Sequence, residues 1–371
     1  MSATGETLTL RQLNRATLAR QLLLERADVG ATVAVERLCG VQAQEARPPF
    51  VGLWTRLAGF RADDLHTLLH KRVVVRGTFL RGTLHLLSAK DYAAFRTAIQ
   101  PVLTDGMRVL GARGKGLVLE DVLAASAELF AKRPRDFNEL RDLLRERFPD
   151  VNERALGFAT RMHLPLVMVP TEDRWGFPSV ASFTPAGEWL GEPLSADDTP
   201  DELVRRYLAA FGPATAADVQ TWSGLKGIKP VLNGLRSELV TLRDEQGREL
   251  FDLPDAPRPD GDVPAPARFL PEFDNLVLSH ADRTRVISDD HRGHVVTKNL
   301  RVRASVFHDG FACGIWDVER KRTGVTLRVT PFGTLSASAV AELTEEAESL
   351  LSFLEPDAAG TGVKFLAPLG G

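Results

Sequence analysis

The chain has 371 residues, of which 46 are lysine or arginine and 49 are aspartate or glutamate, so its formal net charge is −3. This length suits two or three domains of roughly 100–200 residues each. The near-neutral total gives no sign of a generally basic nucleic-acid binder. No apolar run reaches the ~18–20 residues that a membrane-spanning helix needs, which excludes an integral membrane protein of that kind.

The compartment follows from the N-terminus and the cysteines. The first residues lack the basic start and the apolar core of a signal peptide. Cys39 and Cys313 stand far apart with no metal-type spacing, so neither a zinc site nor a disulfide framework is indicated. We therefore expect a reduced cytoplasmic protein without a metal or another cofactor.

The first predicted unit covers residues 8–110. Helical periodicity is followed by two short apolar strands, an order typical of a winged helix. The expected helices span residues 10–26, 32–40, 49–60 and 62–71, and the expected strands span 73–76 and 83–87 around a turn at 80–82.

The same order recurs twice, in units that cover residues 111–195 and 196–258. The second unit begins with a glycine-rich segment, 111–116, which we interpret as a loop because it follows no clear strand. Its expected helices span 136–147 and 152–163, and its strands span 166–169 and 175–177. The third unit has expected helices at 215–222 and 228–239, and strands at 239–242 and 250–251 around the turn 244–248.

Beyond a linker at residues 253–266, rich in proline and aspartate, the pattern changes to the two-residue period of β-strands. Strands are expected at 301–307 and 311–316, followed by a second hairpin with its tip at 321–324 and a closing helix over 336–354. The fold class is therefore α+β, with three tandem winged-helix units and a C-terminal β-rich module at 259–371.

Charge is unevenly distributed along this order. Residues 1–100 hold 14 basic and 8 acidic residues, whereas residues 151–270 hold 12 and 18. The segment 283–303 holds six basic residues against Asp289 and Asp290. A local positive field can engage phosphates on a neutral protein. The alternative is that these are solvated charges on a hairpin.

The chemistry centres on Gln42-Ala43-Gln44, because phosphate loops, metal clusters and nucleophile elbows are missing from the chain. In extended backbone, residues i and i+2 aim at the same face. Two carboxamides can hold a water or a polar ligand but cannot titrate. The alternative is a pair of surface glutamines that cap a helix. Glu45 either adds electrostatic help or starts the next helix.

Several other polar and aromatic residues have a structural alternative. Arg81 and His85 lie on the predicted wing of the first unit, where both are candidates for contacts with phosphates. For Arg81 the alternative is that its side chain holds the turn. Asp274 and Asn275 are expected to bond backbone at the entrance of the C-terminal module. Four tryptophans are expected in the core rather than as platforms for bases: Trp54, Trp189, Trp222 and Trp316.

Taken together, the chain resembles the winged-helix DNA glycosylase family of AlkZ and its relatives, over roughly residues 8–356. The motifs that carry the resemblance are Leu13-Asn14-Arg15, Val41-Gln42-Ala43-Gln44, Leu80-Arg81-Gly82-Thr83-Leu84-His85-Leu86 and Phe269-Leu270-Pro271-Glu272-Phe273-Asp274-Asn275-Leu276 with Arg268 and Ser279-His280-Ala281-Asp282-Arg283. The order and separation of these blocks make the resemblance specific.

The resemblance implies a monofunctional glycosylase that hydrolyses the glycosidic bond of cationic N7-alkylpurines and unhooks interstrand crosslinks of the azinomycin type, giving self-resistance to a DNA-alkylating natural product. It implies a C-shaped monomer around duplex DNA, working at the nucleoid, with Gln42 and Gln44 as the catalytic pair. It also implies a β-hairpin in the DNA cleft, which we place at residues 288–298, with Lys321 and Arg322 as second choice. The DNA-binding residues that we predict are Arg81, His85, Arg283, Arg285, His291, Arg292, Lys298 and Arg301.

Two other classes of function stay open at this point. Tandem winged helices also suit a transcription regulator, which would bind an operator and release no base. A protein that sequesters an alkylating natural product would bind the drug without DNA. The sequence favours the glycosylase because an alkylated purine is already a cationic leaving group, so the shortage of a general acid is tolerable.

Overall fold

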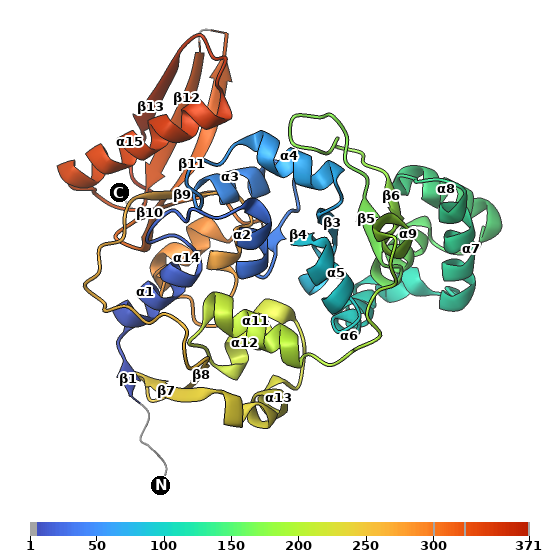
Figure 1. The fold of residues 1–371 in the computed structure, drawn as a ribbon. Coiled ribbons are helices and arrows are strands. Elements are labelled where there is room, and N and C mark those ends of the chain that lie inside the picture. Colours follow the sequence, from blue (N-terminus) through green and yellow to red (C-terminus); the bar gives the residue numbers. More distant parts are fainter. Residues whose placement is uncertain (1–5, 300, 323, 370–371) are drawn as a thin grey trace.

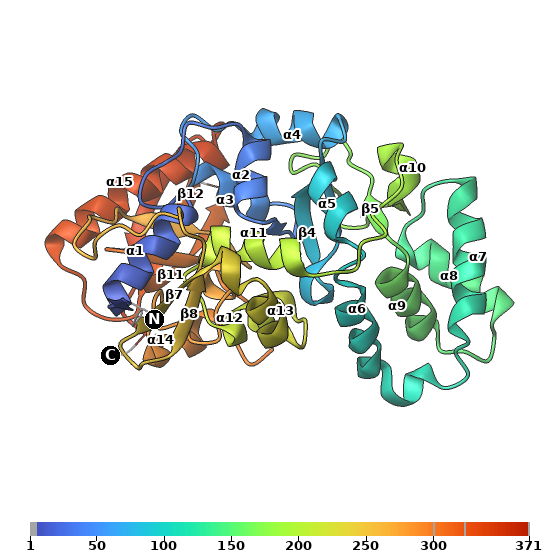
Figure 2. The ribbon, with the colours of Figure 1, turned by 60° about the horizontal axis from the view of Figure 1, so that its bottom comes forward.

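The computed structural model describes residues 6–299, 301–322 and 324–369 (Figure 1). Helices and three β-sheets alternate along these residues, which confirms the mixed α+β class. The α7–α9 helices lie at one end of the molecule, and the C-terminal strands with α15 lie at the other (Figures 1 and 2). Among the described helices, none has the length and apolar character to cross a membrane.

The first predicted unit forms largely where the sequence places it. Thr9 caps the first helix with a reciprocal capping box to Gln12, so the start of that helix is locally encoded. The elements are α1 (Leu10–Arg20), α2 (Ala31–Arg37), β2 (Val41–Gln42), α3 (Pro48–Trp54), α4 (Ala62–His70), β3 (Val74–Thr78), the 3₁₀ helix η1 (Leu80–Gly82), β4 (Leu84–Ser88), α5 (Ala89–Phe95) and α6 (Gln100–Gly106).

The second predicted unit follows with one misplaced strand. Its elements are η2 (Met107–Gly114), α7 (Leu119–Lys132), α8 (Phe137–Arg147), α9 (Glu153–His163), β5 (Leu166–Met168), β6 (Phe183–Pro185) and α10 (Ala186–Leu190). Asp136 and Asn152 cap α8 and α9 as their positions predict. Strand β5 pairs with residues 183–185 and not with 175–177, which form a turn, so that predicted strand is wrong. Most of the predicted 111–116 loop is 3₁₀ helix, broken at Gly111.

One five-stranded sheet joins the first two predicted units, in the order β2-β4-β3-β5-β6. The joint is the pairing of Gly77 with Val167. A Cβ atom at Gly77 would lie 2.9 Å from the carbonyl oxygen of Leu166 and 2.7 Å from the ring of Tyr92, so only glycine permits this close approach. The two hairpins are therefore parts of a single sheet, which periodicity alone does not predict.

The elements predicted within residues 196–258 form in the expected order. The elements of this unit are α11 (Asp201–Phe211), α12 (Ala216–Ser223), α13 (Ile228–Gly234), η3 (Arg236–Glu238), β7 (Val240–Asp244) and β8 (Glu249–Asp252). The predicted hairpin around 244–248 is confirmed. The N-terminal strand β1 (Thr7–Leu8) adds to this hairpin in parallel, beside β7.

The C-terminal module is a five-stranded sheet, in the order β13-β12-β11-β10-β9, covered by one helix. Its elements are β9 (Arg268–Leu270), η4 (Asn275–Val277), α14 (Asp289–Val295), β10 (Ser305–His308), β11 (Phe311–Lys321), β12 (Gly324–Pro331), α15 (Ala337–Leu354) and β13 (Thr361–Phe365). The hairpin predicted at 288–298 is wrong, because Ser288 opens the helix α14 there. The second choice, Lys321 and Arg322, does lie at the turn of the β11–β12 hairpin, whose residue 323 is outside the described residues.

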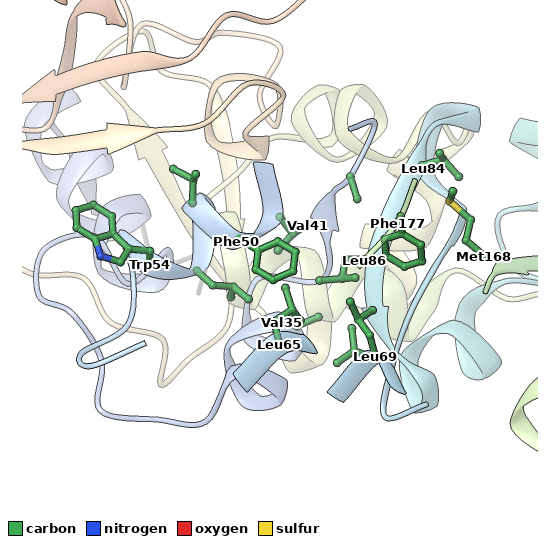
Figure 3. Packing of buried hydrophobic residues seen from close by; sticks show 14 of the residues in the cluster. Val35, Val41, Phe50, Trp54, Leu65, Leu69, Leu84, Leu86, Met168 and Phe177 are labelled. Carbon is green, nitrogen blue, oxygen red and sulfur yellow. The ribbon is translucent and has the colours of Figure 1, made fainter. Parts of the chain in front are cut away.

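The core crosses the predicted unit boundaries. One apolar cluster contains Val35 of the first unit, Met168 of the second and Leu354 of α15. Figure 3 shows part of this cluster, in which Leu84 of β4, Met168 of β5 and Phe177 lie close together. The predicted units therefore share a core, and the packing of these residues positions the site described next.

Candidate active site

Gln42 is held in the sheet with its side-chain oxygen already engaged. It lies in β2 opposite His85 of β4 and is 5% exposed. The Nη2 atom of Arg81 donates to its Oε1 atom at 2.9 Å. An arginine side chain can only donate, so the amide oxygen must face Arg81 and the amide nitrogen must point elsewhere. Among the described residues, none accepts a hydrogen bond from that nitrogen, which leaves it for a ligand.

Gln44 is half-buried and less firmly held. Its Oε1 atom accepts from the backbone nitrogen of Leu84 at 3.4 Å, a long bond that leaves most of the oxygen's accepting capacity free. Arg76 fixes the backbone on both sides of this residue. It donates to the carbonyl oxygen of Ala43 at 2.8 Å and to that of Gln44 at 3.2 Å. The motif is therefore rigid in its main chain and open at one carboxamide.

Gln44 lines a cavity of about 770 Å³ between the five-stranded sheet and helices α8 and α9. Gln42 does not line it, so the two carboxamides do not share this face as the alternation predicts. Glu45 does line it and is the one carboxylate among its described lining residues. The predicted helix-starting role of Glu45 is not seen, because Arg47 is the cap residue of α3.

Arg81 ties Gln42 to distant parts of the chain. Its backbone adopts a left-handed conformation, with φ of 55°, in η1. Besides Gln42, its guanidinium donates to the carbonyl oxygen of Trp222 at the end of α12 and reaches Oδ1 of Asn275 at 3.5 Å. Asn275 in turn donates to the carbonyl oxygen of Gly40, just before β2. The orientation of Gln42 thus depends on three regions that are far apart in the sequence.

The arginines around the two glutamines lack acidic partners. The pKa values of Arg76, Arg81 and Arg283 are lowered to about 10, chiefly by burial, and for Arg81 the nearby charge of Arg283 is part of the cause. Burial also lowers the pKa of Arg161. All stay protonated at neutral pH. None forms an ion pair with a carboxylate of the described chain, and Nη1 of Arg283 is buried without a hydrogen-bond partner. Such a cluster is suited to an anionic ligand.

Two of the predicted DNA contacts lie in the interior. His85 is fully buried between Phe79 and Thr83, and burial together with Arg81 lowers its pKa to about 3. Arg285 is 5% exposed and donates to the carbonyl oxygen of Pro213 at 2.9 Å. Neither side chain is positioned to touch a phosphate, so for these two the prediction is wrong in this structure.

The other predicted contacts lie on or beside α14. Arg292, Lys298 and Arg301 are exposed. His291 is half-buried, with its ring 4.7 Å from that of Phe332. Arg283 is half-buried and lies close enough to Arg81 to lower its pKa. Arg283 therefore links the glutamine motif to the basic segment, because its charge adds to burial in lowering the pKa of Arg81, and the charge of the exposed Arg292 does the same for the pKa of Arg283.

The residues expected to be structural mostly are. Asp274 forms a buried bidentate pair with Arg56 at 2.8 and 2.9 Å. Three of the four tryptophans are buried, and Trp189 is half-buried beneath Arg72. Asn275 is structural in a further sense, because it supports Arg81 beside Gln42.

Sequence reasoning missed Arg76 and Arg161, which surround the glutamine motif. Arg76 sits in a strand of otherwise apolar or small residues, and a charge in such a strand signals a functional or paired group. It also missed an exposed group of possible metal ligands on α4 and the loop after β5, where atoms of His66, His70 and Glu172 lie within 4.8 Å of one another. His66 already bonds the carbonyl oxygen of Asp173, and we assign no metal there.

Comparison with known proteins adds the following. Residues 35–353 match the family model described as "DNA glycosylase AlkZ-like". A curated relative from Streptomyces sahachiroi, named "Interstrand DNA cross-link repair glycosylase", is 25% identical over 89% of this chain and 92% of its own length. The solved structure of the Streptomyces sahachiroi DNA glycosylase AlkZ superposes with a TM-score of 0.78 at 21% identity, covering 97% of this chain and all of that one.

Proposed function

Because this chain belongs to the AlkZ-like DNA glycosylase family and is a DNA glycosylase, we propose that it hydrolyses the N-glycosidic bond of cationic N7-alkylpurines in duplex DNA. We extend the proposal to the unhooking of interstrand crosslinks, which the name of the Streptomyces sahachiroi relative assigns to that protein. The observation that carries the proposal is a pair of glutamines on a rigid main chain, beside arginines without carboxylate partners in the described chain.

The proposed scaffold is three winged-helix units around a duplex. Support comes from the order of elements, because helices followed by a β-hairpin occur in residues 8–110, 111–195 and 196–258. The unpaired arginines at the glutamine motif and the exposed Arg292, Lys298 and Arg301 would contact the phosphates. The hairpin β11–β12, with Lys321 and Arg322 at its turn, replaces residues 288–298 as the proposed DNA-cleft hairpin.

The proposed reaction needs no acid on the leaving group. The bond between sugar C1′ and purine N9 breaks, and its electron pair neutralises the positive charge of the alkylated base. The charge passes to the sugar, where a water oxygen adds to C1′ and releases a proton to solvent. An abasic site and a neutral alkylpurine result. Glu45 and the DNA phosphates are the anions in reach of the cationic sugar, and the arginines hold those phosphates.

The two glutamines have different proposed roles, because the structure holds them differently. Gln44 has an oxygen with spare accepting capacity, so it orients the attacking water. Gln42 has its oxygen taken by Arg81 and its nitrogen free, so it donates to the substrate. Neither side chain can act as a true base, and the rate gain comes from positioning.

The test is base release by the purified protein. Duplexes that carry one N7-methylguanine or one nitrogen-mustard crosslink are incubated with the protein and then treated with alkali to cut at abasic sites. We expect cleavage at the methylated base and separation of the crosslinked strands. If neither duplex releases a base, the proposed reaction is wrong. A transcription regulator would instead bind one operator sequence and release nothing, and the family assignment disfavours it.

The self-resistance role is a separate proposal and has a separate test. Expression of the chain in a bacterium sensitive to azinomycin should raise survival in the presence of that drug. Equal survival with and without the protein would remove this role while leaving the base-release chemistry intact.

A further inference from the structure

The cavity beside Gln44 is larger than a purine needs. Its volume is about 770 Å³, whereas a site for a drug-sized molecule usually measures roughly 300–1,000 Å³. It begins at one of the proposed catalytic residues and extends away from Gln42, toward α8 and α9. Whatever occupies it therefore adjoins the reacting base but is not the base alone.

Apolar side chains form part of the lining on the sheet side, where the guanidinium of Arg76 also lies over the ring of Phe177 at 4.9 Å from its centre. Leu84, Met168 and Phe177 come from the shared core and lie close together (Figure 3). Val180, in the same loop as Phe177, also lines the cavity and is 55% exposed, which is unusual for a valine that lines a hollow. An aromatic or aliphatic group placed against these apolar side chains would remove the exposed apolar surface from water.

Helices α8 and α9 bring three arginines to the lining, together with Phe137 and Phe158 of the same helices. Arg141, Arg154 and Arg161 project from α8 and α9 into the lining. Arg154 is exposed and its side chain has neither a hydrogen bond nor an ion pair to the described residues. Arg161 uses only Nε, which donates to Thr78 at 3.3 Å, so its two terminal nitrogens have no protein acceptor in the described chain. These donors suit a carboxylate or a carbonyl oxygen.

We propose that this cavity receives the alkyl substituent on N7 and selects substituents that combine an aromatic ring with an acidic or carbonyl group. The inference rests on the proposed function and deepens it, because it names the part of the lesion that the enzyme recognises beyond the purine. The ring packs on Leu84, Phe177 and Val180, and the acceptor group binds Arg154 and Arg161.

Two nitrogen mustards give a matched pair of probes. Chlorambucil and mechlorethamine attach to guanine N7 through the same chloroethylamine chemistry, but chlorambucil carries a phenyl ring with a carboxylate tail and mechlorethamine carries a methyl group. Duplexes with one hydrolysed N7 monoadduct of each are compared in single turnover, with each rate divided by its spontaneous depurination rate. The measured quantity is the ratio of the two corrected rates.

Two variants test the two parts of this lining. For wild type we expect a ratio of about ten or more in favour of chlorambucil, and we expect Arg154→Gln to lower it roughly tenfold through the lost charge-assisted bond. Val180→Gln should lower it about threefold by placing a polar amide in the apolar part of the lining. Matched controls are Arg113→Gln, an exposed arginine outside the cavity, and Val118→Gln, which is 53% exposed and also outside it.

The outcomes separate this inference from the proposed function. If wild type releases neither adduct, both fall. If it releases both with a ratio near one, the inference is wrong while the proposed reaction stands. The same holds if Arg154→Gln slows both adducts equally, which would show that this arginine binds DNA phosphate. A ratio that falls in both cavity variants and in neither control supports the inference.

Discussion

Two sets of buried arginines in this molecule have opposite surroundings. Arg20 and Arg56 each form a bidentate pair with a carboxylate, Asp252 and Asp274, and all four side chains are at most 2% exposed. Beside the glutamines, Arg76 is 5% exposed and Arg81 is half-buried, but both bond only carbonyl and amide oxygens. The positive charges of the first set are neutralised by carboxylates of the protein. Those of the second set have no carboxylate partner in the described chain and are available to an anionic substrate.

This difference separates stability from function. A buried charge pair is costly to break, because removing one partner strands the other. A buried arginine without an acidic partner holds uncompensated charge in the folded protein, and such groups concentrate at functional sites. Substitutions in the two sets should therefore change different properties, and the following predictions test that separation from the largest expected effect to the smallest.

The largest effect is expected in the paired set. Arg56→Met leaves Asp274 buried without its partner, which should lower the free energy of unfolding by about 3–5 kcal/mol. Urea denaturation followed by fluorescence measures this loss. Adding Asp274→Asn should recover part of it by removing the stranded charge. A loss below about 1 kcal/mol would mean that this pair is not structural.

The unpaired set should behave in the opposite way. Arg81→Met removes the donor that orients Gln42, so single-turnover base release should fall roughly 100-fold. The free energy of unfolding should change by less than about 2 kcal/mol, since only hydrogen bonds are lost. DNA affinity at the same salt concentration should fall less than the rate does. An unfolding loss equal to that of Arg56→Met, with normal release per folded molecule, would contradict the separation.

Lowering the pH should destabilise the folded protein through the buried histidines that lie near the unpaired arginines. Burial lowers the pKa of His85 and of His280 to about 3 in the folded protein, below the ordinary value of 6.5. The unfolded chain therefore binds more protons than the folded one as pH falls from 6.5 toward 3. Stability present above pH 6.5 should be lost over that window, by up to about 1.4 kcal/mol per pH unit for each histidine.

The measurement for the histidines is urea denaturation at pH 6.5, 5.5 and 4.5. In this range the carboxylates contribute less to the pH dependence of the unfolding free energy than they do at lower pH. His85→Phe keeps a ring in contact with Phe79 and should remove about half of the slope. An unchanged slope in that variant would show that His85 titrates normally in the folded protein.

The smallest effect is on the salt dependence of DNA binding. If Arg283 contacts a phosphate, Arg283→Gln should reduce the slope of log K against log salt by about 0.9. Arg205 is the control, because it is already paired with Glu238 on the surface. Arg205→Gln should leave the slope unchanged. An equal change in both variants would show that general charge, and not the unpaired site, governs binding.

Local signals predicted much of the fold, and non-local pairing accounts for what they missed. Helix caps such as Asp136 and Thr215, and the turn at 244–248, are encoded within a few residues. Strand β6 was misplaced because its partner is chosen by the sheet and not by its own sequence. Helix α14 has a local start signal, Ser288 followed by two aspartates, and the hairpin that the family resemblance implied for the same residues is wrong.

The site was predictable in its motif but not in its surroundings. The pattern at Gln42 and Gln44 stands out in the sequence, whereas the roles of Arg76 and Arg161 depend on a sheet that joins two predicted units. Burial also decides which basic residues are available. His85 and Arg285 resemble DNA contacts in the sequence, but tertiary packing encloses both. Charge patterns in the sequence thus indicate which region is basic. Burial and ion pairing in the structure show which of its side chains are available to bind DNA.

The most direct test of the central proposal is single-turnover release of N7-methylguanine by Gln44→Ala, with DNA affinity measured in parallel. The control is Gln246→Ala, a change at an exposed glutamine in the β7–β8 turn. We predict that Gln44→Ala slows release about 100-fold, with DNA affinity and folding close to wild type, and that the control has no effect. Release by Gln44→Ala at the wild-type rate would contradict the assignment of Gln44 as the residue that orients the water.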